Sequence, residues 1–260
     1  PLSFSMRAFR ALKERSDEFD LVIDNGSLAY GNLKIQKKLG LPILGIIHHP
    51  ITVDRRLELD NARTFLERLG KRRWYAFTRM QTRVCQKIQR IITVSESSKE
   101  DISHDHKVDV NKIHVVPIGI DTDFFAPQTD IERISGRIVS TASADVPLKG
   151  QKFLLEAIAK VRDEFPHVHL ELVGKQREGS TTAETLNQLG LDDIVRFNQG
   201  ISYKELVNLL ASAEVAIVPS LYEGFSIPAI EALSCGAPLI ASTGGALPEV
   251  AGPHLETCLA

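Results

Sequence analysis

The chain of 260 residues is long enough for about two domains of roughly 100–200 residues each. Its 43% apolar and 25% charged residues are typical of a globular protein. They exclude a disordered tail, a collagen-like fibre and a disulfide-stapled miniprotein. The 3 cysteines, Cys85, Cys235 and Cys258, are too few and too scattered for a metal cluster, and we expect buried or idle thiols. No apolar run approaches the ~20 residues that span a bilayer.

The net charge of −2 is unevenly distributed along the chain. Residues 1–126 carry 21 basic and 16 acidic side chains, a balance of +5, whereas residues 127–260 carry 10 and 17, a balance of −7. This asymmetry indicates two domains and predicts an anionic partner for the first one. A nucleic-acid partner is not expected, because the whole chain is mildly acidic and shows no aromatic RNA-binding signature.

In chain order, a helix-like stretch at Met6–Arg15 is followed by short β-branched runs that alternate with amphipathic stretches. We expect strands at Leu21–Asp24, Ile43–Ile47, Arg90–Val94, Ile113–Val116, Arg137–Thr141, His169–Val173, Val195–Phe197, Val215–Pro219 and Pro238–Ala241. We expect helices at Gly31–Leu39, Ser97–Ser103, Lys149–Glu164, Thr182–Gly190, Ser202–Ala213 and Pro228–Ser234. The alternation predicts an α/β fold with doubly wound parallel sheets, and a loss of periodicity near Ala126 predicts the domain boundary.

Between residues 54 and 90, basic side chains are interleaved with apolar ones at helical spacing. Gly70 is predicted to divide this stretch into two helices. A basic amphipathic helix that contains Trp74 is typical of a helix lying on an anionic membrane. The alternative is the solvated face of a helix that packs on the core.

Two polar motifs follow this basic stretch. Ser97 and Glu100 have the spacing of a capping box, so Ser97 is predicted to cap the next helix, with Ser95 as the alternative cap. His104 and His106 flank an aspartate in a pattern that could suggest a metal. We interpret them instead as solvated residues of a polar loop.

A possible anion site follows the strand at residues 215–219. Pro228 fits the first position of a helix, so Ser226 or Ile227 is expected at the cap. The free amides of Phe225, Ser226 and Ile227, together with the helix dipole, favour an anion. Gly224 lets the backbone approach such a ligand closely.

Two carboxylates, Glu223 and Glu231, bracket this loop. A carboxylate beside a phosphate is useful only if it accepts hydrogen bonds from hydroxyl groups, as an acidic residue does on a ribose. A diphosphate with a sugar at each end would satisfy both groups. The alternative is that Glu231 is a first-turn helix residue and Glu223 a surface residue of the loop.

These motifs resemble those of the family 4 retaining glycosyltransferases, also described as group 1 glycosyl transferases, which have the GT-B fold. The resemblance is carried by residues 223–236, 238–242 and 244–249, by Val94-Ser95-Glu96, by Pro117 to Asp121 with Phe125, and by Lys149-Gly150 and Val173-Gly174. It implies two Rossmann-like domains facing across a cleft, with residues 1–126 on the acceptor side and residues 127–260 binding a nucleotide sugar. The chain looks incomplete at both ends, and the first domain lacks its first strand–helix unit.

The resemblance also assigns the donor site. Glu223 contacts the donor sugar, Glu231 binds the nucleotide ribose, and Lys149 neutralises the diphosphate. The amides of Gly224 to Ile227 hold sugar hydroxyls and phosphate. The base-contact region contains Gly174 and Ile201, for which a simple strand-end turn is the alternative.

In the first domain, the resemblance places a histidine after the strand at residues 43–47, facing the transferred sugar. His48 is the better match, and His49 is the alternative. Many relatives also carry an arginine shortly before the lysine that Lys149 matches. Here Ser143 or Ala144 stands at that position.

The implied function is that of a hexosyltransferase, which moves a sugar from a nucleotide-diphosphate-sugar donor to an acceptor hydroxyl with retention of configuration. Neither a metal nor another cofactor is expected. The acceptor is a glycan, a lipid-linked sugar or a small molecule, and the expected location is cytoplasmic, with an anionic membrane as a further partner of residues 54–90. The alternatives are an inactive fragment or nucleotide-sugar-binding module and, less favoured, a GT-B nucleotide-sugar epimerase.

Overall fold

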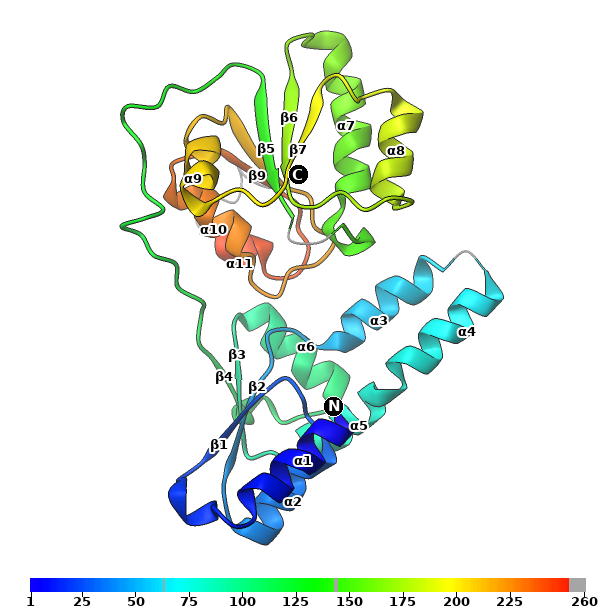
Figure 1. The fold of residues 1–260 in the computed structure, drawn as a ribbon, viewed down its shortest axis with the longest axis vertical. Helices are drawn as coiled ribbons and strands as arrows, with labels where there is room; N and C mark the ends of the chain where they lie inside the picture. Colours follow the sequence, from blue (N-terminus) through cyan, green and yellow to red (C-terminus); the bar gives the residue numbers. More distant parts are fainter. Residues whose placement is uncertain (63, 143–144, 253–260) are drawn as a thin grey trace. The chain divides into compact units, whose positions relative to one another are not determined.

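The computed structural model describes residues 1–62, 64–142 and 145–252. The chain divides into two compact units, Pro1–Pro117 and Ile118–Ala260, each built around one sheet (Figure 1). Every pair of neighbouring strands in both sheets is parallel. Among the described residues, no helix combines the length and the apolar character needed to cross a bilayer.

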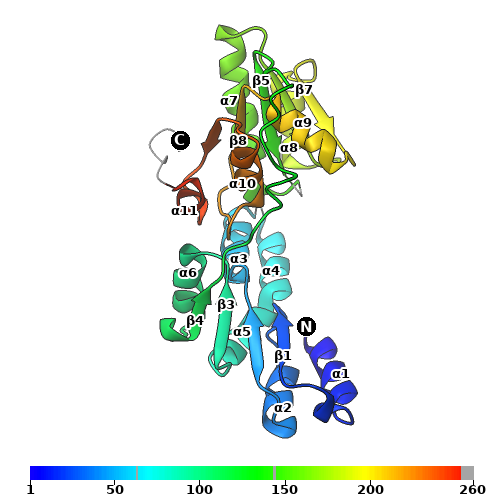
Figure 2. The same cartoon turned by 90° about the vertical axis from the view of Figure 1, so that its left-hand side faces the viewer.

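Unit 1 contains a sheet of order β1-β2-β3-β4. Its elements are α1 (Leu2–Leu12), β1 (Val22–Asn25), α2 (Tyr30–Leu39), β2 (Ile43–Ile46), α3 (Ile51–Asp60), α4 (Phe65–Trp74), α5 (Thr78–Cys85), β3 (Arg90–Thr93), α6 (Glu96–His106) and β4 (Ile113–Val115). The core forms where Ile35, Val84 and Ile102, from three different helices, pack against strand residues such as Ile43 and Ile91. The helices α3 and α4 run side by side as a hairpin (Figures 1 and 2).

Unit 2 contains a sheet of order β7-β6-β5-β8-β9. Its elements are β5 (Arg137–Thr141), α7 (Gln151–Glu164), β6 (His169–Val173), α8 (Thr181–Leu189), β7 (Val195–Asn198), α9 (Tyr203–Ala211), β8 (Val215–Val218), α10 (Ile227–Ser234), β9 (Leu239–Ala241) and α11 (Leu247–Ala251). One core packs α7 and α8 against the sheet, and a separate core packs α9, α10 and α11. The sheet of unit 2 is therefore covered on both faces, as a doubly wound sheet requires.

The nine predicted strands are all present, with ends that differ by at most one residue from the prediction. The first helix is displaced, because α1 covers Leu2–Leu12 instead of Met6–Arg15. Packing divides the chain after Pro117 instead of near Ala126. The reason is that Phe125 is buried in the core of unit 2, where its carbonyl accepts a hydrogen bond from the Ser234 hydroxyl.

The predicted helix break at Gly70 is wrong, because α4 runs through this residue. No atom lies within 4 Å of the position that a Cβ would occupy at Gly70. The only penalty is therefore the low helix propensity of glycine, which destabilises the helix by about 1 kcal/mol relative to alanine. The chain leaves the α-helical path later, in the 3₁₀ turn Tyr75–Phe77.

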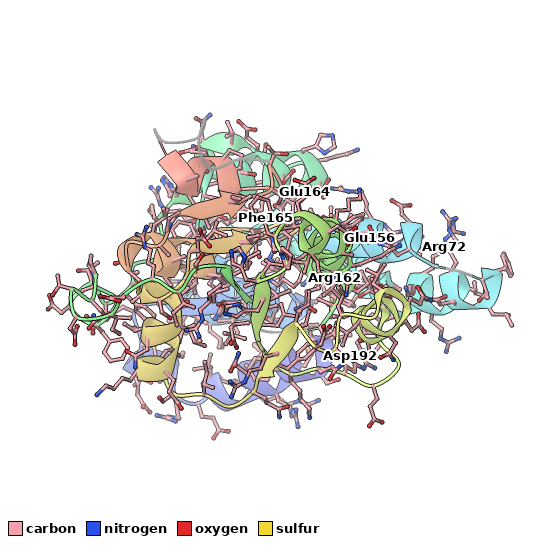
Figure 3. All side chains as sticks on the ribbon, turned by 90° about the horizontal axis from the view of Figure 1, so that it is seen from above. Arg72, Glu156, Arg162, Glu164, Phe165 and Asp192 are labelled. Atoms are coloured by element: carbon pink, nitrogen blue, oxygen red, sulfur yellow. The ribbon has the colours of Figure 1, made fainter. Side chains whose placement is uncertain are left out.

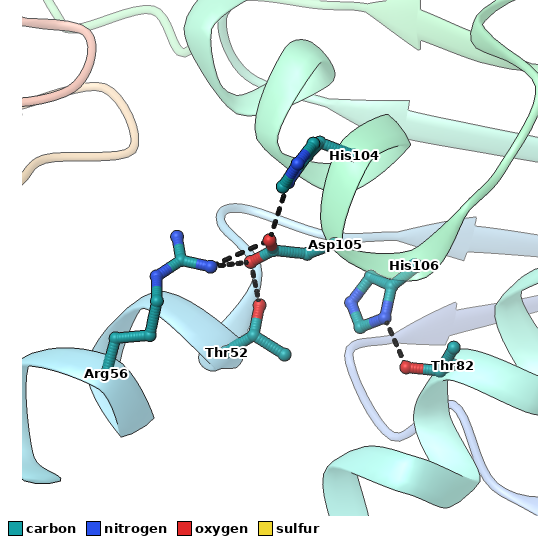
Figure 4. Close-up of polar contacts among 6 residues, drawn as sticks. All are labelled: Thr52, Arg56, Thr82, His104, Asp105 and His106. Atoms are coloured by element: carbon teal, nitrogen blue, oxygen red, sulfur yellow. Dashed lines mark hydrogen bonds and ion pairs between the residues drawn. The ribbon is translucent and has the colours of Figure 1, made fainter.

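The assignment of His104 and His106 to a loop is wrong, since both belong to the last turn of α6 (Figure 4), and His104 is solvated as predicted whereas His106 is not. His106 is buried, its Nδ1 lies 2.9 Å from Thr82 Oγ1, and burial lowers the pKa of its imidazole. The helix begins two residues earlier than the capping box at Ser97 implied. Its cap is Ser95, whose Oγ accepts a hydrogen bond of 3.0 Å from the Ser98 amide.

The cysteines that the structure describes are buried free thiols, as predicted. Burial raises the pKa of Cys85 to about 12 and that of Cys235 to about 11. Cys258 lies outside the described residues.

Candidate functional site

The topology of unit 2 creates a site at the ends of two central strands. β5 and β8 are hydrogen-bonded neighbours, but the helices that follow them, α7 and α10, belong to the two different cores. The connections therefore leave β5 and β8 in opposite directions, and the carboxyl ends of such strands are where doubly wound sheets bind ligands. The segment that precedes α7 and the segment 219–226 line this end of the sheet.

Backbone contacts hold these two segments together. The Leu221 amide donates to the Leu148 carbonyl at 2.8 Å. Gly150 has φ +65°, and a Cβ at this position would lie 1.9 Å from the Pro219 carbonyl oxygen. Glycine is therefore required where the turn before α7 packs on the end of β8. This turn places Lys149 beside the loop that contains Glu223.

Lys149 and Glu223 form the charged centre of the site. Lys149 Nζ lies 2.8 Å from Glu223 Oε1, and the two side chains are only 18% and 11% exposed. The same oxygen accepts a hydrogen bond of 2.7 Å from Ser220 Oγ. Ser220 was not predicted from the sequence as a site residue, although its place directly after a buried strand is a signal for such a role. The structure thus brings together two predicted site residues that are 74 positions apart.

The segment after β9 packs against the backbone of the loop that contains Glu223. The Ala246 amide donates to the Glu223 carbonyl at 2.9 Å. A Cβ at Gly245 would lie 2.3 Å from that carbonyl oxygen, and one at Gly244 would lie 2.6 Å from the Leu221 carbonyl. The paired glycines of the family motif therefore permit close packing of two loops.

The loop ends at Ser226, which is the N-cap of α10. Its φ of +83° lies in the left-handed region that favours glycine, and its buried Oγ has no hydrogen-bond partner among the described residues. The following residues, Ile227 and Pro228, begin the helix. In the described part of the chain, the amides of Phe225, Ser226 and Ile227 donate to no backbone carbonyl. They remain available to an anion.

Glu231 lies about one turn inside α10. Glu231 is only 8% exposed, and burial raises the pKa of its carboxyl group. Within the described ranges, no hydrogen-bond or ion-pair partner is found for this carboxylate. Its oxygens are not among the fully buried unpartnered side-chain atoms of the described residues, so they are open to the site and can accept hydrogen bonds from a ligand.

The two predicted base-contact residues have clear structural roles. Gly174 has φ +152°, and a Cβ there would lie 2.3 Å from the Ala142 carbonyl oxygen, so glycine lets β6 end close to β5. Ile201 is partly buried and packs against the core beside α9 and α10. Ser143 and Ala144, which stand where relatives carry an arginine, lie outside the described residues.

A second site lies in unit 1, at the carboxyl ends of β1 and β2. A cavity of about 200 Å³ is lined by Asn25, His48, His49 and Gln81, among others. His48 is exposed, and its Nε2 lies 3.1 Å from Asn25 Oδ1. His49 instead contacts Asp54 at 2.9 Å, in the first turn of α3. Gln81 is buried, and its Oε1 has no hydrogen-bond partner among the residues described. Asn25 and Gln81 were not identified from the sequence, although Asn25 ends a strand.

Family models match almost the whole chain. Residues 1–124 match the model described as Glycosyltransferase Family 4, and residues 131–257 match Glycosyl transferases group 1. The chain is 49% identical over 256 residues to the MMP alpha-(1->4)-mannosyltransferase of Mycolicibacterium hassiacum, and the match covers 98% of this chain and 61% of that protein. It is 32% identical over 180 residues to the D-inositol 3-phosphate glycosyltransferase of Mycolicibacterium smegmatis, which covers 65% of this chain and 41% of that relative.

Solved structures share the fold. Sucrose-phosphate synthase from Thermosynechococcus elongatus matches with a TM-score of 0.75 and 22% identity, over 98% of this chain and 63% of that one. Anabaena HepE, solved in complex with UDP-glucose, matches with a TM-score of 0.72 and 16% identity, over 98% of this chain and 67% of that one. Together with the family models, these matches agree with the resemblance of the sequence motifs. The chain therefore belongs to the group 1, family 4 glycosyltransferases and has their GT-B fold.

Proposed function

We propose that this chain transfers a mannosyl residue from a nucleoside-diphosphate sugar to an acceptor hydroxyl with retention of configuration. The observation that carries this proposal is the Glu231 carboxylate, which has no partner among the described residues and follows the loop that holds Glu223 against Lys149. Identity of 49% to an alpha-(1->4)-mannosyltransferase supports mannose as the sugar and an α-linked product. Structural neighbours solved with UDP and UDP-glucose support a nucleotide-sugar donor.

The groups of the site suit the separate parts of such a donor. The ribose hydroxyls would donate hydrogen bonds to Glu231, which relieves its buried charge. The diphosphate would accept hydrogen bonds from the amides of Phe225, Ser226 and Ile227 at the start of α10. Lys149 would turn from Glu223 to the diphosphate and leave that carboxylate free to accept a hydroxyl of the sugar.

These groups also suit the chemistry of transfer. The bond between C1 of the sugar and the diphosphate oxygen breaks, and an oxocarbenium-like sugar forms while negative charge grows on the leaving phosphate. Lys149 and the helix amides stabilise that growing charge more than the ground state, which is the role that a metal ion has in other transferases. The acceptor oxygen forms the new bond to C1 on the same face, and the leaving phosphate takes its proton. In unit 1, His48 is proposed to stabilise the transferred sugar.

The proposal is tested by nucleotide binding and by sugar transfer. In calorimetry of the purified chain, we expect Glu231→Ala to weaken binding of UDP or GDP by roughly 10–100-fold, because a hydrogen bond to a charged group is lost. Lys149→Ala is expected to lower turnover of GDP-mannose or UDP-sugars more than it weakens binding. The matched control is Glu156→Ala, at a half-exposed ion pair of α7, which should change neither quantity.

Three results would contradict the proposal. Nucleotide binding without transfer to any oligosaccharide acceptor would identify a binding module. Conversion of the donor sugar in the absence of an acceptor would identify an epimerase. Unchanged turnover in Lys149→Ala would remove the role assigned to this lysine.

A further inference from the structure

The helix α4 turns a polar side toward the rest of unit 1. Lys71 Nζ lies 2.9 Å from Glu67 Oε1 and donates at 3.0 Å to the Glu58 carbonyl of α3. The Glu58 carboxylate accepts a hydrogen bond of 3.0 Å from Tyr75 Oη, directly after α4. The contacts between the two helices of the hairpin are therefore polar, although α4 is rich in apolar residues.

Three apolar residues of α4 lie on the side opposite its polar contacts with α3. Phe65 and Leu66 are each 77% exposed, Leu69 is 53% exposed and Trp74 is 73% exposed. At 100° per residue, Phe65, Leu66 and Leu69 fall within one side of the helix, whereas the exposed Trp74, nine residues after Phe65, lies on the opposite side at the end of α4. No residue of α4 is buried. An ordinary surface helix places its apolar side on the core, so α4 has the reverse orientation and presents a surface for a partner.

Positive charge surrounds this apolar surface. Arg68, Arg72 and Arg73 are exposed, and none of them has an ion-pair partner in the described parts of the chain. Figure 3 shows the Arg72 side chain extending from the ribbon of α4 into solvent. Residues 64–90 contain 8 basic and 1 acidic side chain. The partner that fits this surface is therefore apolar in part and anionic.

The hairpin is fixed to the body of unit 1 at its base. The Asp105 carboxylate of α6 lies 2.7 Å from Arg56 Nη1 and accepts a hydrogen bond from Thr52, and both of these residues belong to α3 (Figure 4). The outer side of α4 can therefore contact a partner while the core of unit 1 stays folded.

We infer that the outer surface of α4 (Phe65, Leu66, Leu69 and the three arginines) binds an anionic lipid surface. The apolar side chains would enter the boundary between headgroups and acyl chains, while the guanidinium groups contact lipid phosphates. A second copy of this chain fits less well. A symmetric contact through α4 would bring the same three arginines of both copies together without acidic groups to compensate them.

Trp74 is the only tryptophan of the chain and, as an exposed residue at the end of α4, reports on the environment of this helix. With vesicles of phosphatidylcholine and phosphatidylglycerol, we expect the chain to co-sediment and the Trp74 fluorescence to change as α4 meets the lipid. With phosphatidylcholine alone, or in high salt, both signals should be lost, because screening weakens the attraction of the arginines. Absence of both signals with the anionic vesicles would overturn the inference.

Variants separate the two contributions to lipid binding. Phe65→Ser/Leu69→Ser should weaken vesicle binding by at least roughly tenfold, and Arg72→Gln/Arg73→Gln by roughly thirtyfold at low salt. The matched controls lie in unit 2, where Phe153→Ser removes a side chain that is 54% exposed and Arg196→Gln/Lys204→Gln removes two exposed charges. Equal binding by the α4 variants and the wild type would overturn the inference. The same follows if the α4 variants abolish a concentration-dependent dimer that forms without lipid.

Discussion

At the scale of single residues, Ser226 has a backbone conformation that a serine adopts only with strain. Its φ of +83° is paired with an Oγ that has no partner among the described residues. We expect Ser226→Gly to raise the free energy of unfolding by about 1 kcal/mol, measured by urea denaturation. The same substitution at Ser202, which caps α9 at φ −70°, should instead lower stability, because its side chain accepts from the Glu205 amide. A loss of stability in Ser226→Gly would show that the hydroxyl matters more than the backbone strain.

The Lys149–Glu223 pair gives a second prediction at this scale. Removing one partner leaves a mostly buried charge, so Lys149→Met should cost about 2 kcal/mol of unfolding free energy without ligand. The double variant Lys149→Met/Glu223→Gln removes the unpaired charge and should recover most of this loss. A double-mutant cycle in urea measures the coupling. Additive losses in the double variant would mean that the two side chains do not interact in solution.

At the scale of elements, α4 contains a glycine that no contact requires. Gly70 is exposed, lies inside the helix and has no atom within 4 Å of the position of a Cβ. Gly70→Ala should therefore raise the helix content and stabilise unit 1 by up to about 1 kcal/mol. Thermal unfolding followed by Trp74 fluorescence measures this gain. Gly150→Ala is the contrasting variant and should be strongly destabilising, because its Cβ would overlap the Pro219 carbonyl.

The contact between α5 and α6 depends on a neutral histidine. Burial lowers the pKa of His106 below its usual value of 6.5, although the adjacent Asp105 opposes this shift. Below about pH 6.5 this histidine is protonated in the unfolded chain but stays neutral in the folded chain. The free energy of unfolding therefore falls on acidification, by at most about 1.4 kcal/mol per pH unit. The urea midpoint should drop between about pH 7.5 and pH 5.5, and His106→Asn should reduce this dependence. An unchanged slope in the variant would assign the pH dependence to other groups.

At the scale of the whole molecule, the chain contains separate cores in two units of opposite charge. Unit 1 carries 21 basic and 14 acidic residues, or +7, and unit 2 carries 10 and 19, or −9.

The proposed nucleotide site lies entirely in unit 2, whereas Trp74 lies in unit 1. At about 100 times its dissociation constant, a nucleoside diphosphate should stabilise unit 2 by about 2.7 kcal/mol. We therefore expect the unfolding midpoint from circular dichroism to rise more than that from Trp74 fluorescence. Equal shifts would show that the units unfold together.

Strands were predicted correctly where the residues next to one another in the sequence decide which side chains are buried. The strand at Arg137–Thr141 was predicted with its observed ends, because a run of β-branched residues flanked by polar ones is buried on both faces. The burial of a side chain could not be predicted where it depends on a contact with a residue distant in the sequence. The prediction that His106 is solvated is wrong because α5 covers this residue, whereas the sequence left open whether Phe65 and Leu69 are buried or exposed.

The sequence by itself determined the fold class, the order of the elements and the family, because strand periodicity, helix starts and the spacing of the Glu223–Glu231 motif are local properties. Only the tertiary structure decided that Lys149 lies 2.8 Å from Glu223. The two residues come from loops after different strands, and the strand order that makes β5 and β8 neighbours is a property of the assembled sheet. In the same way, only the packed structure shows that Phe65 and Leu69 lie opposite the contacts between α4 and α3, because a helical pattern does not specify which side of a helix meets the protein.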